Sequence, residues 1–78
     1  MSQVADRTRK VIAKLLKVSP EKVTDKAHFV RDLGMESIQA VELLAALEEE
    51  FDVEVDEHRA QSNDPVGKAI AYMEELVG

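Results

Sequence analysis

Apolar side chains recur at helical spacing in three separate segments, and this pattern limits the possible folds of the chain more than any other feature. The first segment predicts an amphipathic helix from about residue 3 to 17, which Pro20 ends because proline disfavours a helical residue before it. The second predicts a helix over residues 37–51. A third is predicted to begin at Asp64-Pro65, with the aspartate as N-cap and the proline at the first helical position.

The segments between the helices predict one long loop and one short connector. Residues 19–36 form the loop, with one helical turn expected after Pro20, and a loop of this length is typically functional. Residues 51–57 alternate apolar and polar side chains, but a lone strand has no partner, so an extended connector with Val53 and Val55 inward is expected. Residues 56–61 could form a short further helix. Four apolar loop residues are expected to pin the loop to the core: Val23, Phe29, Val30 and Leu33.

We therefore expect an all-α fold: a small bundle of three main helices plus one short helix, with a long loop between the first two. A chain of 78 residues predicts a single domain over residues 1–78. The absence of cysteine excludes disulfides, cysteine-ligated zinc and thiol catalysis. No apolar run approaches the roughly 20 residues of a membrane span, and no leader pattern precedes the domain, so the cytoplasm is the expected compartment.

Charge is distributed unevenly along the chain. Residues 1–31 carry a net charge of +5 and residues 32–78 carry −11. Between Asp32 and Glu57 there are ten carboxylates and no lysine or arginine, a block that would repel nucleic acid phosphates and attract basic protein surfaces. An acidic surface that serves only solubility is the alternative.

The second helix carries two apolar stripes, whereas an ordinary surface helix carries one. The core stripe consists of Ala40, Leu43, Leu44, Leu47 and Phe51. The smaller stripe consists of Ile38, Val41 and Ala45, with Glu42 and Glu49 on one side and Glu48 on the other. This second stripe either packs under the loop or another helix, or forms a docking face with an apolar centre and a charged rim.

Local spacing does not assemble a catalytic site, so an enzyme is not expected. Residues 34–37 do not match the nucleophile elbow of hydrolases. Asp52, Glu54 and Asp56 have the 1-3-5 spacing of a calcium loop, but the required glycine and final glutamate are missing. The two histidines, His28 and His58, are isolated and suggest no shared metal.

Ser37 stands at the predicted start of the second helix. This position favours a role as N-cap. It also suits a phosphate group, because free N–H groups and the positive end of the helix dipole meet there. Both roles are compatible, with the cap present before modification.

Residues 29–38 read FVRDLGMESI and resemble the prosthetic-group motif of acyl carrier proteins, usually written D-L-G-x-D-S-L. The resemblance continues through residues 41–51 and 66–73 and covers nearly the whole chain. It implies that Ser37 receives 4′-phosphopantetheine from coenzyme A through a phosphopantetheinyl transferase. The thiol of that arm would carry acyl groups as thioesters.

The resemblance also implies partners and further site residues. The partners would be acyl-transfer and chain-elongation enzymes with basic docking patches, and the chain would act as a monomer. The docking residues would be Glu36, Ile38, Val41, Glu42, Ala45, Glu48 and Glu49. Residues near an interior cavity for the acyl chain would be Leu47, Phe51, Ile70 and Tyr72.

Several positions depart from the family pattern: Glu36 replaces aspartate, Ile38 replaces leucine, Ala45 is smaller than usual, Asp56 stands where proline is frequent, and Asn63 stands where an apolar residue is usual. These departures suggest a specialised carrier for lipid or polyketide-type synthesis beside housekeeping fatty acid synthesis. Two other classes compete. An unmodified acidic helical adaptor would use the second stripe without any arm, and a calcium-responsive protein would change helicity with calcium.

Overall fold

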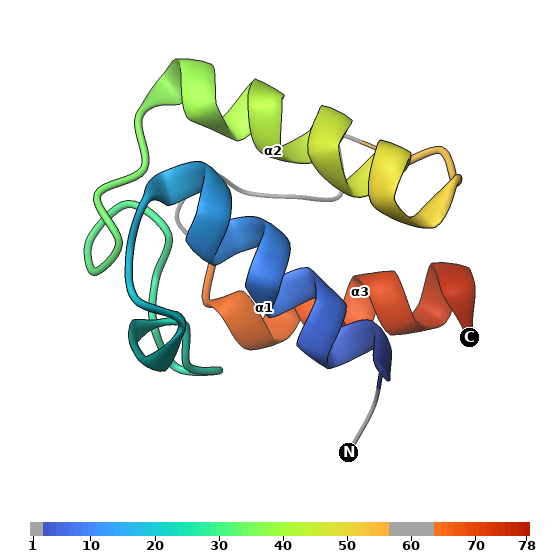
Figure 1. Cartoon of the computed structure of the whole chain (residues 1–78), viewed down its shortest axis with the longest axis horizontal. Coiled ribbons are helices and arrows are strands. Elements are labelled where there is room, and N and C mark those ends of the chain that lie inside the picture. Colours follow the sequence, from blue (N-terminus) through green and yellow to red (C-terminus); the bar gives the residue numbers. More distant parts are fainter. Residues whose placement is uncertain (1–2, 57–63) are drawn as a thin grey trace.

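The computed structural model describes residues 3–56 and 64–78, and the regular elements in these ranges are helices (Figure 1). Helix α1 spans Gln3–Leu16, the 3-10 helix η1 spans Pro20–Lys22, α2 spans Ser37–Phe51 and α3 spans Val66–Val77. The predicted all-α class is confirmed, and so is the single helical turn after Pro20. The short helix expected over residues 56–61 lies, from position 57 onward, outside the described residues.

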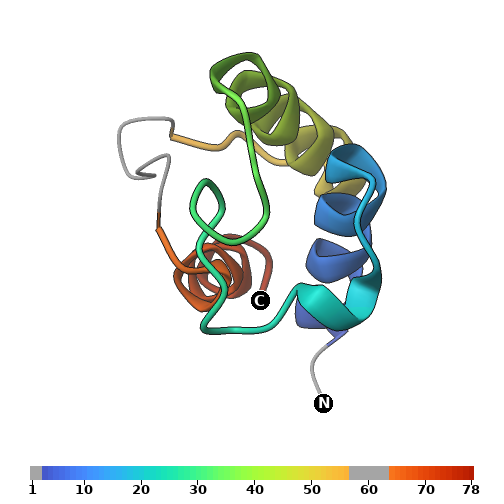
Figure 2. The same ribbon diagram turned by 90° about the vertical axis from the view of Figure 1, so that its left-hand side faces the viewer.

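Helix α1 is the central element of the bundle. It packs against α2 and α3 more closely than these two pack against each other, and Figures 1 and 2 show it beside both. Its inward face buries Ile12 and Leu16 completely or nearly so. The Thr8 hydroxyl in the same face donates a hydrogen bond to the Val4 carbonyl at 2.7 Å, so this buried polar group is satisfied.

Helix α1 ends in a left-handed residue rather than at the proline itself. Lys17 has a φ of 57°, and the next residue, Val18, donates its N–H to the carbonyl of Ala13 at 3.0 Å. This geometry is a common way to satisfy the last carbonyls of a helix. It turns the chain out of α1 before Pro20 begins η1.

One apolar core joins the three helices and the loop between α1 and α2. Burial of this apolar surface is the main force that holds so small a bundle together. Its buried apolar residues are Ala5, Ile12, Ala13, Leu16, Val23, Ala27, Phe29, Leu33, Met35, Leu43, Leu47, Val66, Ile70 and Met73.

The loop is pinned to this core by residues that differ partly from those predicted. Phe29 and Leu33 are buried as expected, but Val30 is 42% exposed, so its assignment to the core is wrong. The reason is a tight turn in which the N–H of Gly34 donates to the Val30 carbonyl and the N–H of Met35 donates to the Phe29 carbonyl. Phe29, Leu33 and Met35 face the core, whereas Val30, at the start of the turn, faces outward.

The start of α3 also differs from the prediction. Pro65 is the N-cap and Val66 the first helical residue, so the assignment of Asp64 as N-cap is wrong by one position. The physical reason is that the loop provides the cap, because the N–H of Val66 donates to the Ala27 carbonyl at 2.8 Å and the N–H of Gly67 to the Asp25 carbonyl at 2.9 Å. These bonds satisfy donors that a side-chain cap would otherwise take.

The connector after α2 has no regular structure up to residue 56, and side chains of both α2 and α3 accept hydrogen bonds from its backbone. The Val55 N–H donates to the Glu48 carboxylate at 2.9 Å, and the Asp56 N–H donates to the Tyr72 hydroxyl at 2.9 Å. Val53 and Val55 lie half-buried against the core, as predicted. The connector is therefore tied to both α2 and α3. No helix in the described ranges combines the length and apolarity that a bilayer crossing requires.

Candidate functional site

Ser37 is the first residue of α2, and it is exposed. The N-cap is Glu36, whose backbone is extended, so the N-cap role predicted for Ser37 is wrong by one residue. The Glu36 N–H donates to the Gln39 side-chain oxygen at 2.9 Å, and the Glu36 carbonyl accepts from the Ala40 N–H at 3.1 Å. The helix start is thus capped without the Ser37 hydroxyl, which makes no hydrogen bond to any described residue.

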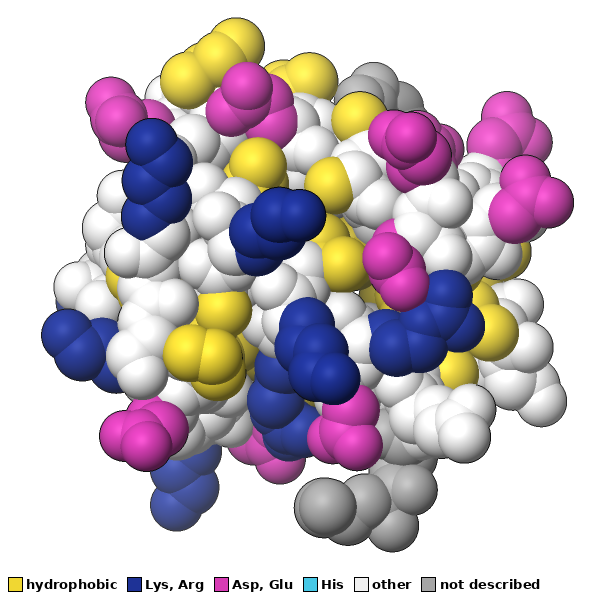
Figure 3. Space-filling view, viewed as in Figure 1, with side chains coloured by type: hydrophobic (Ala, Val, Ile, Leu, Met, Phe, Trp, Pro, Cys, Tyr) yellow, Lys and Arg dark blue, Asp and Glu magenta, His cyan; other side chains and the backbone are white. Residues whose placement is uncertain are grey.

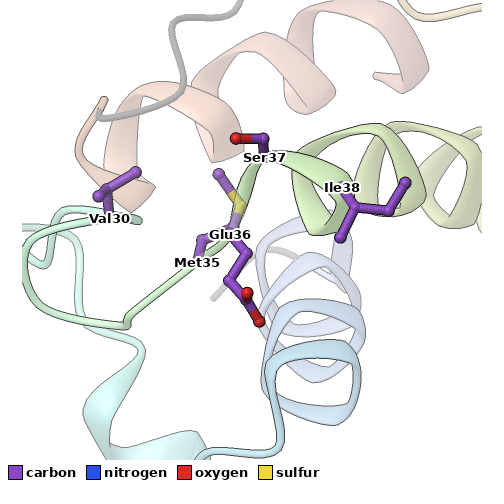
Figure 4. Close-up of a pocket in the computed structure, with 5 residues that line it drawn as sticks. All are labelled: Val30, Met35, Glu36, Ser37 and Ile38. Carbon is purple, nitrogen blue, oxygen red and sulfur yellow. The ribbon is translucent and has the colours of Figure 1, made fainter.

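The surroundings of Ser37 fit a covalently attached phosphate. The backbone N–H groups of the first turn of a helix lack partners within the helix, and the positive end of the helix dipole favours an anion there. Figure 4 shows the Ser37 hydroxyl pointing away from the Glu36 carboxylate. An anion on this hydroxyl would therefore be directed away from the negative charge of the adjacent residue.

The loop before Ser37 is braced by the carboxylate of Asp32. This carboxylate accepts the backbone N–H of His28 at 2.7 Å and lies 3.4 Å from the Arg31 guanidinium. The hydrogen bond from His28, followed by that from Arg31, holds the pKa of Asp32 below its usual value. Gly34 then takes a φ of 69°, which glycine adopts without steric cost, and this turn directs the chain toward α2.

The outer face of α2 exposes the second apolar stripe. Ile38 is 65% exposed and Val41 is 63% exposed, so neither is covered by the loop or by another described helix. Ala45 and the carboxylates of Glu36, Glu42 and Glu49 are exposed as well. Figure 3 shows hydrophobic and acidic side chains together over α2, while basic side chains gather over α1. The charge asymmetry of the sequence thus becomes an asymmetry between two surfaces.

Glu48 differs from the other carboxylates assigned to this face. It is half-buried, and its carboxylate accepts the N–H of Val55. The structure therefore gives Glu48 a role in holding the connector.

The four residues assigned to an acyl cavity lie in different environments. Leu47 and Ile70 are buried in the core. Phe51 is half-buried, with the guanidinium carbon of Arg7 4.5 Å from its ring centroid, and Tyr72 accepts the Asp56 N–H through its hydroxyl. Two of these residues belong to α2 and two to α3. The backbones of these two helices make fewer close contacts with each other than either makes with α1.

A pocket adjoins Ser37 on the side of the loop. It is open to solvent on one side, has a volume of about 660 Å³, and is lined by Val30, Met35, Glu36, Ser37 and Ile38 (Figure 4). The sequence prediction put Val30 in the core and did not single out Met35. The adjacent apolar residues Phe29 and Val30 could have indicated that one of them faces outward, because neighbouring side chains in a turn rarely face the same side.

No group of three or more histidine, cysteine or acidic side chains lies together within the described ranges in a way that could hold a metal ion. The acidic residues with calcium-loop spacing, Asp52, Glu54 and Asp56, are exposed. His28 bonds within the loop, while His58 and Asn63 lie outside the described residues.

The chain is similar to known proteins over its full length. A family model described as a phosphopantetheine attachment site matches residues 6–73. An acyl carrier protein of Phenylobacterium zucineum is 45% identical over 78 residues, covering 100% of this chain and 99% of the relative. An acyl carrier protein of Caulobacter vibrioides is 44% identical over 75 residues, covering 96% of each chain.

Proposed function

This chain belongs to the acyl carrier protein family, and we propose that Ser37 is the residue that holds its 4′-phosphopantetheine group. The family role is to carry acyl groups, which the thiol of the bound arm holds as thioesters, and to present them to biosynthetic enzymes. The observation that supports Ser37 is its exposed hydroxyl at the first position of α2, which makes no hydrogen bond to the described residues.

Intact mass measurement tests this assignment. The chain is incubated with coenzyme A, magnesium and a broad-specificity phosphopantetheinyl transferase, beside Ser37→Ala and Ser19→Ala. Ser19 is a matched control because it is also an exposed serine at a helix start, namely that of η1. We expect a gain of one phosphopantetheinyl group in the wild type and in Ser19→Ala, and none in Ser37→Ala. A folded wild type that no transferase loads would favour the unmodified adaptor instead.

We further propose that the outer face of α2 docks partner enzymes through basic patches on their surfaces. Exposed Ile38 and Val41 form the apolar centre, and Glu42 and Glu49 form the charged rim. Electrostatic docking of this kind raises the association rate without requiring tight binding, which suits a carrier that must also dissociate.

Charge reversal tests the docking face. We expect Glu42→Lys with Glu49→Lys to lower the kcat/KM of loading by the transferase and to weaken its dependence on salt concentration. Glu74→Lys, an exposed carboxylate on α3, is the control and should change neither. Equal effects of all these reversals, or no effect of any, would indicate that the acidic rim serves only solubility.

We propose that acyl chains enter between α2 and α3 near Leu47, Phe51, Ile70 and Tyr72. The few close contacts between the backbones of these two helices support this view. Chemical-shift changes confined to the arm after acylation would contradict it.

We also propose a monomeric, single-domain carrier of the cytoplasm, which sedimentation and fractionation would test. A specialised pathway is supported by the departures at Glu36, Ile38 and Ala45; full activity with housekeeping elongation enzymes would contradict it.

A further inference from the structure

Val30 lines the same pocket as Ser37, and its side chain is exposed rather than packed in the core. Val30 is 42% exposed, whereas its neighbour Phe29 is 4% exposed. Ile38, the residue after Ser37, is 65% exposed. Val30 comes from the loop and Ile38 from α2, yet both line the same pocket, together with the buried side chain of Met35 (Figure 4).

This pocket has the properties of a site for a small aliphatic group. Its volume of about 660 Å³ falls in the range of about 300–1,000 Å³ that is typical of small-molecule sites. Three of its five lining residues are apolar, and the other two are Ser37 and Glu36. The pocket therefore combines apolar walls with the proposed point of attachment.

We propose that Val30, Met35 and Ile38 hold the branched aliphatic part of the phosphopantetheine arm, so that the arm rests against the loop between deliveries. This inference rests on the proposed attachment to Ser37. The arm has a carbon with two methyl groups close to its phosphate, before its amides and its thiol. Apolar walls match those methyl groups, while the helix N-terminus matches the phosphate.

The tether identifies the occupant of the pocket. A group attached to Ser37 is confined near the pocket at an effective concentration on the order of millimolar, so weak apolar contacts are enough to populate the resting position. A free ligand would have to bind this partly open pocket without that advantage. Because Ser37 is itself a lining residue, the arm reaches the pocket from its own point of attachment.

The arrangement couples the arm to partner docking. Ile38 belongs both to the pocket and to the proposed docking face, whereas Val30 belongs to the pocket alone. A partner that covers Ile38 competes with the arm for that side chain. Docking would then favour release of the arm toward the partner.

Methyl NMR on the full-length chain tests the inference. The protein is labelled at valine and isoleucine methyls, loaded with the arm from coenzyme A, and checked for complete loading by intact mass. We expect nuclear Overhauser contacts from the dimethyl group of the arm to Val30 and Ile38, and restricted motion of that group. Val30→Asn should remove the contact to position 30, weaken the contact to Ile38 and raise the mobility of the arm. Ile38→Asn should also raise the mobility of the arm. Val77→Asn is the matched control, since Val77 is 38% exposed at the end of α3, and it should behave like wild type.

The outcomes separate this inference from the proposed attachment. Complete loading at Ser37 with no contact to either methyl group, or an arm equally mobile in wild type and Val30→Asn, would overturn the resting position and leave the attachment intact. Failure of Ser37 to load in a folded chain would overturn both. Amide spectra of each variant establish that the fold persists, and these exposed positions are expected to tolerate asparagine.

Discussion

Replacing Gly34 isolates the cost of the backbone turn that leads the chain toward α2. Gly34 has a φ of 69°, and its N–H donates to the Val30 carbonyl at 3.1 Å. A Cβ added at this position would have no heavy atom within 4 Å beyond its chain neighbours. Any loss of stability in Gly34→Ala must therefore come from the backbone conformation, because the space around the new side chain is open.

The expected magnitude is the difference between two opposing effects. An L-residue in the left-handed region costs about 1–2 kcal/mol, while replacing glycine restricts the unfolded chain and returns about 0.4–1 kcal/mol. Gly34→Ala should thus lower the free energy of unfolding by about 1 kcal/mol. For a domain of this size that corresponds to a fall in Tm of about 4–8 °C. Gly34→Asn should cost less than alanine, because asparagine tolerates the left-handed region.

Gly67 provides the contrast, because its constraint is contact. It does not have a positive φ, but an added Cβ would lie 3.1 Å from the carbonyl oxygen of Asp25. Asparagine at this position is bulkier than alanine and a poorer helix former, so it should cost more. The order of alanine and asparagine is therefore expected to reverse between the two glycines.

Urea unfolding of the four single variants, followed by circular dichroism at 222 nm, measures this order. Equal m-values would show that the changes act on stability rather than on compactness of the unfolded state. Wild-type stability of Gly34→Ala, or a Gly34→Asn variant no more stable than Gly34→Ala, would contradict an origin of the cost in the left-handed backbone.

Three further changes test other parts of the structure. The hydrogen bond from the His28 N–H holds the pKa of Asp32 low, so the stabilising effect of its carboxylate is complete above about pH 4 and is lost as pH falls through the folded pKa. In a plot of the urea unfolding midpoint against pH, Asp32→Asn should therefore reduce the decline at acid pH. Lys17→Gly should raise the free energy of unfolding by about 0.5–1 kcal/mol in the same urea assay, since its φ is 57°. Arg7→Met should lower the free energy of unfolding by about 1 kcal/mol. The same change should still cost part of this free energy in a Glu50→Gln background, because Arg7 also donates to the Glu50 backbone carbonyl at 2.7 Å; no cost in that background would contradict the geometry.

The helices could be predicted from the sequence because helical periodicity is local. The predicted span of residues 37–51 agrees with α2, and the angular positions of Ile38 and Val41 on that helix place them on the face that the structure exposes. These features depend on about 100° of rotation per residue and on nothing distant in the chain.

The errors arose where particular hydrogen bonds, some of them between distant segments, decide the outcome. Asp64 loses the N-cap position to Pro65 because loop carbonyls satisfy the first N–H groups of α3. Ser37 loses its cap role to Glu36, whose N–H is held by Gln39. Val30 leaves the core because the turn ending at Gly34 rotates it outward. Residue type and spacing favoured the predicted alternative in each case, and hydrogen bonds of the folded chain reverse it: those of the loop for Asp64 and Val30, and that of Gln39 for Ser37.

The same loop helps to position Ser37 in a bundle whose second and third helices make few close backbone contacts with each other. The loop attaches to α3 through the bonds from Val66 and Gly67, and through the Phe29 N–H, which donates to the Asp64 carbonyl at 3.2 Å. The position of Ser37 therefore depends on the loop and on α1 rather than on direct packing of α2 against α3. A carrier needs a fixed point of attachment and, under the proposed function, an interior that admits cargo. Under the proposed function, separate contacts would meet these two needs, and side chains between α2 and α3 would rearrange around cargo without displacing the serine.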